Sequence, residues 1–225
     1  MGKPVTLRPE STGRKEMGFV AKPSASKEFK LVPAGTYTAR CYQMIDCGTQ
    51  KTTGQFGEKE QHKIRISWEV FGEDDSGQAL TVDIKGKQMP MTVDREFTMS
   101  MHENATLRAF LSNWRGKAFT DDEAFTFDIS KLVGAYAMVS VAHSESKNGK
   151  TYANVVSAVK LPKELSNAKP EGVHEAVIFN LDDPDLQVFD ALPQWMQEKI
   201  QASPEWKKQW NKTASSTVDD DSVPF

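Results

Sequence analysis

Cysteine is almost absent from this sequence of 225 residues, since Cys41 and Cys47 are the only two. Two cysteines cannot supply a framework of several disulfides or a four-cysteine zinc site, so a reducing cytoplasm is the expected location. No apolar run approaches the roughly 20 residues of a membrane span, and the N-terminus has no signal-peptide core. We therefore expect a cytoplasmic protein without a membrane segment.

Motifs of common enzymes and metal sites are also missing. The four histidines are scattered without HExxH or Cys–His spacing, and the Gly54–Gly57 stretch lacks the Gly-Lys-Ser/Thr ending of a P-loop. We expect no enzyme activity, no catalytic residue, no metal and no cofactor. A metal-dependent nuclease stays an alternative, because carboxylates that converge from different strands cannot be recognised in a sequence.

The two ends of the chain carry opposite net charges. Residues 1–30 carry seven Lys or Arg against three Glu, a net charge of +4, whereas residues 161–225 have a net charge of -6. Such asymmetry is typical of interaction tails. We expect four regions: a flexible basic arm at 1–30, a folded domain at 31–162, a linker with short Trp-bearing helices at 163–211, and a disordered acidic tail at 212–225.

Alternating apolar residues predict strands at 36–46, 62–71, 93–101, 135–143 and 151–160, with an irregular hairpin at 78–92 and a loop at 48–57. In the second strand, one face carries Ile64, Ile66, Trp68 and Val70. A helix fits residues 104–114 with Asn104 as its N-cap, and short helices begin near residues 192 and 203. Whether the Trp-bearing segment at 192–210 packs on its own domain or on a neighbouring subunit stays open.

The order β-β-β-α-β-β predicts a fold class that is mainly β. A five-stranded OB-fold-like barrel has one helix between its third and fourth strands, which is where residues 104–114 fall. β-Sandwiches also have short strands at this spacing, but they rarely place a single amphipathic helix at that point. We therefore expect an OB-fold domain, followed by short C-terminal helices, with disordered termini.

The last seven residues form the sharpest motif, Asp219-Asp220-Asp221-Ser222-Val223-Pro224-Phe225. Consecutive carboxylates cannot fold alone, and an aromatic ring beside a free carboxylate suits a pocket that contains a cation. The run resembles the tail of bacterial single-stranded DNA-binding proteins, which ends in several Asp, a short apolar residue and Pro-Phe. The phrases PAGTY at 33–37 and GKTYAN at 149–154 look like those of small bacteriophage replication proteins.

The resemblance implies a bacteriophage protein of the host cytoplasm that binds single-stranded DNA during replication and recombination. Its tail would recruit polymerases, helicases or nucleases through Asp219, Asp220, Asp221, Pro224 and Phe225. By the same resemblance, Phe225 would fill an apolar pocket, its carboxylate would meet a cation, and the Asp run would steer the encounter by charge. The competing interpretation is a protein-interaction module whose tail only adds solubility.

An OB barrel that binds single strands needs cations along the phosphates and flat rings on which bases stack. Polar strand faces and the first and last loops, which flank the ligand face of OB folds, supply the candidates. The expected DNA-binding residues are Arg40, Tyr42, Lys51, Phe56, Lys59, Lys63, Arg65, Lys147, Lys150 and Tyr152. Singly, each Lys is typical of a solvated surface and each ring of core packing; only their coincidence favours a binding face.

Overall fold

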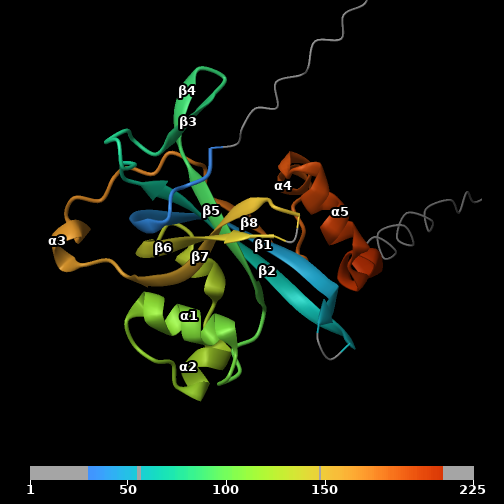
Figure 1. The fold of residues 1–225 in the computed structure, drawn as a ribbon. Helices are drawn as coiled ribbons and strands as arrows, with labels where there is room; N and C mark the ends of the chain where they lie inside the picture. The colour runs from blue at the N-terminus through green and yellow to red at the C-terminus, as the bar shows by residue number, and fades with distance from the viewer. Residues whose placement is uncertain (1–29, 55–56, 147, 210–225) are drawn as a thin grey trace, which may run out of the picture.

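The computed structural model describes residues 30–54, 57–146 and 148–209 (Figure 1). Its main feature is an antiparallel sheet with the strand order β5-β2-β1-β6-β7. The strands of this path are β1 (Gly35–Gly54), β2 (Gly57–Phe71), β5 (Thr92–Thr98), β6 (Tyr136–Glu145) and β7 (Thr151–Lys160). The expectation of a mainly β protein is therefore confirmed, and all five predicted strands are present.

A separate hairpin of β3 (Thr81–Ile84) and β4 (Lys87–Pro90) fulfils the prediction for residues 78–92 and projects from the sheet in Figure 1. The loop expected at 48–57 is wrong, because β1 and β2 continue as a paired ribbon as far as Gly54 and Gly57. Register shifts at 41/43 and 46/48 insert extra residues into β1. They break the period of two on which the sequence prediction depended.

The helix expected at 104–114 is present as α1 (Thr106–Arg115), and it buries Leu107, Phe110, Leu111 and Trp114. Asn104 is not its N-cap, since Ala105 occupies that position and no side chain caps the helix. The next helix, α2 (Asp121–Thr126), was not expected, and it begins with a capping box between Thr120 and Glu123. A 3₁₀ turn, η1 (Ile129–Leu132), leads to β6.

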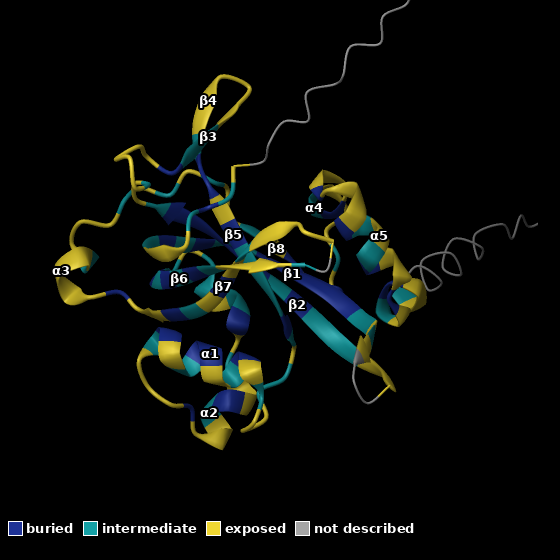
Figure 2. Cartoon of the chain, in the orientation of Figure 1, coloured by how far each residue is buried: buried dark blue, intermediate teal, exposed yellow. Residues whose placement is uncertain are grey.

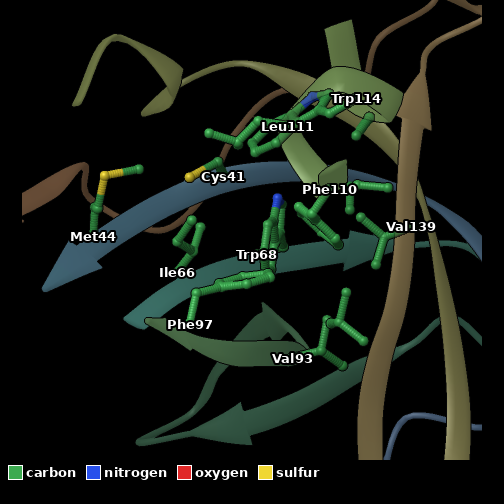
Figure 3. Packing of buried hydrophobic residues seen from close by; sticks show 14 of the residues in the cluster. Cys41, Met44, Ile66, Trp68, Val93, Phe97, Phe110, Leu111, Trp114 and Val139 are labelled. Atoms are coloured by element: carbon green, nitrogen blue, oxygen red, sulfur yellow. The ribbon is translucent and has the colours of Figure 1, made fainter. Parts of the chain in front are cut away.

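The main core lies between the inner face of the sheet and α1 (Figure 3). Trp68 is fully buried, with its ring centroid 5.8 Å from that of Phe110 and 5.7 Å from that of Trp114. Ile64, Ile66 and Val70 are buried on the same side of β2, as their alternation predicts. The inner face of the sheet and α1 thus form one packed unit. This core does not cover the outer face of the sheet.

Part of that outer face is covered by the C-terminal segment. This segment contains α3 (Lys163–Ser166), β8 (Val177–Phe179), α4 (Leu186–Ala191), α5 (Gln194–Ala202) and a helical stretch at 204–209. β8 pairs in parallel with residues 43–45 of β1, just beyond the point where β1 stops pairing with β6. Within the described residues, no helix is long and apolar enough to cross a bilayer.

A second core joins this segment to β1, so the segment at 192–209 packs on its own chain. It consists of Ile45, Cys47, Phe179, Leu181, Phe189, Leu192, Met196, Ile200 and Trp206. Figures 1 and 2 show α4 and α5 beside the β1–β2 ribbon, with buried positions turned toward it. From Met44 to Cys47 β1 is buried on both faces, since Met44 belongs to the main core and Ile45 and Cys47 to the second, and Asp46 is buried between them.

Polar contacts fasten the end of the C-terminal segment to the ribbon. Glu205 accepts hydrogen bonds from the backbone N–H of Thr49 at 2.9 Å and from its hydroxyl at 2.5 Å. Burial raises the pKa of Glu205, but these hydrogen bonds outweigh burial and hold the pKa below its ordinary value. His62 lies against Glu205 and donates a 2.6 Å hydrogen bond to the carboxylate of Asp46.

Candidate nucleic-acid interface

Two neighbouring hollows run along β5, and together we call them the β5 groove. The first, about 470 Å³, is lined in part by Lys63, Arg95, Thr98 and His102. The second, about 520 Å³, is lined by Arg65, Asp94, Arg95, Glu96, Asn154, Val155 and Val156. Arg95 and Glu96 line both hollows, so the two adjoin at these residues.

The Arg95 side chain lies between β5 and β7, the two end strands of the sheet, and we call the gap between these strands the seam. β5 and β7 stand at the two ends of the strand path, and no ladder joins them. The Arg95 guanidinium donates hydrogen bonds to the carbonyls of Val155 at 3.1 Å and Val156 at 2.9 Å. It also lies 4.8 Å from the ring centroid of Phe97. Burial lowers the pKa of Arg95, but an arginine keeps its charge at neutral pH.

Lys63 and Arg65 lie on the outward face of β2 beside the groove, as their alternation predicts. The Lys63 ammonium donates to the neutral oxygens of Gln61 at 2.8 Å and Thr98 at 3.0 Å. Arg65 forms an ion pair with Asp94 at 2.5 Å. Among the described residues, neither Lys63 nor Arg95 has a carboxylate within ion-pair distance, so these two cations carry charge that the chain does not neutralise locally.

Helix α5 contributes two residues that sequence reasoning did not assign to a binding site. Trp195 lies with its ring centroid 4.8 Å from the Arg65 guanidinium, and Lys199 forms an ion pair with Glu96. The sequence showed three tryptophans clustered after residue 192, but nothing in it indicated that one of them lies against β2. With Lys199 included, the groove and its immediate contacts hold four cationic side chains against the carboxylates of Asp94 and Glu96.

The remaining predicted cations and Tyr152 lie around this groove or beyond it. Tyr152 is 49% exposed on β7, two residues from Asn154, and side chains two apart point to the same side of a strand. Lys59 shares the outward face of β2 with Lys63 and Arg65. Lys51 lies at the end of the ribbon within 3.8 Å of Glu60, and Lys150 is exposed in the turn before β7.

Arg40 and Tyr42 are engaged by the C-terminal segment. Arg40 pairs with the buried carboxylate of Glu69 and donates to the carbonyl of His174. The Tyr42 ring lies 4.7 Å from the His174 ring, and burial raises the pKa of its phenol. These two side chains hold residues 173–174 against the sheet, and a base could stack on Tyr42 only on the face that His174 leaves uncovered.

Several predicted residues lie outside the part of the chain that the structure describes. They are Phe56 and Lys147 of the candidate DNA-binding set, and Asp219, Asp220, Asp221, Pro224 and Phe225 of the tail. Among the described residues, no group of three or more His, Cys, Asp or Glu is placed to hold a metal ion.

Comparison with known proteins gives no family for this chain. No protein-family model matches the sequence, and no curated protein matches it. An interpretation of its function therefore depends on the geometry and charge of the β5 groove.

Proposed function

We propose that this chain is a single-stranded DNA-binding protein of the bacteriophage type with an OB-like domain. In this proposal β1, β2, β5, β6 and β7 are the five OB strands, and α1 falls between the third and fourth of them. The strand order supports it, because β1 pairs with both β2 and β6 while β5 and β7 meet at the seam. The seam bridged by Arg95 then corresponds to the partly open side of such a barrel.

The observation that carries the proposal is the β5 groove with its two unneutralised cations; an exposed ring lies on β7, two residues from Asn154 of the second hollow. Lys63 and Arg95 would bind the phosphates of the DNA strand, and Tyr152 on β7 would offer a flat surface on which a base can stack. Stacking contributes about 1–3 kcal/mol per base and tolerates every base, so binding would be largely independent of sequence. The protein would coat and protect single strands in the host cytoplasm without catalysing a reaction.

The acidic tail completes the proposal through its resemblance to bacterial tails. Phe225 and its carboxylate would dock on replication or recombination enzymes such as polymerases, helicases or nucleases, with the Asp run steering the encounter. Removal of residues 219–225 should abolish capture of such a partner and leave the β5 groove intact. A truncated chain that still captures the partner would refute this role for the tail.

Fluorescence anisotropy with labelled oligo-dT tests DNA binding. We expect the unmodified chain to bind the single strand in preference to a duplex, with a log–log salt slope of about -0.7 per phosphate contact. Lys63→Gln should reduce the magnitude of that slope by about 0.7, because one phosphate contact is lost. Lys131→Gln, an exposed lysine of η1, is the matched control and should leave the slope unchanged. Absence of binding to oligo-dT at low salt would refute the proposal.

A protein-interaction module is the second candidate, and one observation favours it. The cations Arg65 and Lys199 are already paired with Asp94 and Glu96, so DNA phosphates would compete with carboxylates of the chain. A partner protein with both acidic and basic side chains on its surface could pair with these cations and with these carboxylates, which DNA phosphates cannot do. Equal or absent binding of single and double strands in the anisotropy experiment would favour this second function.

A further inference from the structure

Trp195 differs from the other described tryptophans in its exposure. Trp68, Trp114 and Trp206 are at most 9% exposed, whereas Trp195 is 48% exposed. Leaving an indole half in water forgoes the stabilisation that its burial would give. The neighbouring residues Met196 and Ile200 of α5 are buried in the second core, to which Trp195 does not belong.

The orientation of Trp195 is fixed by contacts on both sides of α5. Met196 and Ile200 hold one face of the helix against β1. Lys199, one turn after Trp195 and on the same face, is held by its ion pair with Glu96 of the groove. α5 therefore presents Trp195 and Lys199 together toward the outer surface of β2 and β5.

The Arg65 guanidinium lies against the Trp195 ring, and Arg65 also lines the second hollow of the β5 groove. Its ion pair with Asp94 keeps the guanidinium in place. A cation on one face of an indole holds the ring in a fixed orientation. About half of the Trp195 side chain remains exposed, which leaves part of the indole accessible to a second flat group.

We propose that Trp195 is a base-stacking residue and that the C-terminal segment is therefore part of the DNA-binding site. This inference rests on the proposed function and assigns a residue to it that lies outside the five-stranded domain. A strand whose phosphates meet Lys63 and Arg95 in the groove would place a base over the exposed face of Trp195. The site would then be composite, with cations from β2 and β5 and a stacking ring from α5.

The experiment uses the full-length chain and three variants. Trp195→Ala should weaken binding to oligo-dT by about 5- to 150-fold, the range for loss of one stacked base. Its salt slope should stay unchanged, because no phosphate contact is lost. Trp195→Phe should keep most of the affinity, since a flat ring remains. Phe125→Ala is the matched control, because Phe125 is 73% exposed on α2 and lines neither hollow of the groove.

Tryptophan fluorescence gives a readout that a merely structural role would not move. The fifth tryptophan, Trp210, lies outside the described residues, so it is replaced by Phe in this experiment. In that background oligo-dT should quench the emission of the exposed Trp195, and Trp195→Phe should remove the quenching. Thermal unfolding of Trp195→Ala should match that of the parent protein. If it does not, the quenching measurement decides, because it leaves Trp195 in place: absence of quenching by oligo-dT would overturn the inference.

The outcomes separate this inference from the proposed function. If the unmodified chain does not bind oligo-dT, the proposed function fails and the inference fails with it. If the unmodified chain binds while Trp195→Ala binds equally well, the inference is wrong and the proposed function stands. Quenching of Trp195 by oligo-dT combined with unchanged affinity of Trp195→Ala would also overturn it, since the ring would then be near DNA without holding it.

Discussion

The buried carboxylate of Glu69 links the sheet to the C-terminal segment. Glu69 has no exposed surface, and it pairs with Arg40 while accepting hydrogen bonds from the backbone N–H groups of Val173 at 3.1 Å and His174 at 2.9 Å. The Arg40 guanidinium in turn donates to the carbonyl of His174. Without the carboxylate, the N–H groups of Val173 and His174 would lose their acceptor and Arg40 would lose its ion-pair partner.

We expect Glu69→Ala to lower the free energy of unfolding by about 3–5 kcal/mol. Removing one partner of a buried ion pair leaves the other charge without compensation, and Arg40 has only 15% of its side chain exposed. Against a total stability of about 5–15 kcal/mol for a typical domain, such a loss is large. Glu69→Gln keeps an acceptor for one N–H group, so we expect a smaller loss of about 1–3 kcal/mol.

Urea unfolding, followed by circular dichroism and by tryptophan emission, measures these losses. Glu175→Ala is the matched control, since this exposed carboxylate lies one residue from His174 and should change stability by less than about 0.5 kcal/mol. Replacing Arg40 and Glu69 together by methionine should recover part of the loss, because no buried charge is then left alone. A loss below about 1 kcal/mol for Glu69→Ala, the range of a surface ion pair, would refute this reasoning.

Two further predictions concern the second core and the thiols. Gly48 has a φ of +67°, and a Cβ built there would lie 2.5 Å from the Cβ of Ser203, whereas Gly86 has a φ of +83° and open space. Both Gly→Ala variants incur a left-handed backbone cost of about 1–2 kcal/mol, and Gly48→Ala should lose about 1–3 kcal/mol more through overpacking; equal urea midpoints would contradict this. Burial raises the pKa of the Cys41 and Cys47 thiols to about 12, so at pH 8 both should resist a thiol reagent until the chain unfolds. The raised pKa values also contribute to the stability of the folded chain. Because the folded pKa values are raised, this stabilisation is complete below the unfolded pKa of about 8.5 and is lost as the pH rises toward about 12. Rapid labelling of the native protein would show that the thiols are accessible.

The sequence determined the elements whose pattern is local. Alternation along β2 predicted which side of the strand is buried, and the 3.6-residue spacing of Leu107, Phe110, Leu111 and Trp114 predicted α1. The same alternation placed Lys63 and Arg65 on the outward face beside the groove. These predictions succeeded because a side chain's direction in a regular strand or helix depends only on its position in the element.

Tertiary structure alone decided the features that depend on distant contacts. The second core buries the outer face of β1 at Ile45 with residues more than 130 positions later, and no local period reveals such a partner. The same docking engages Arg40 and Tyr42 with His174, and it brings Trp195 onto Arg65. The register shifts in β1 likewise follow from its pairing with β2. Residue types and spacing therefore specified the strands and the outward cations, whereas packing of the C-terminal segment decided which of the outward side chains it contacts itself.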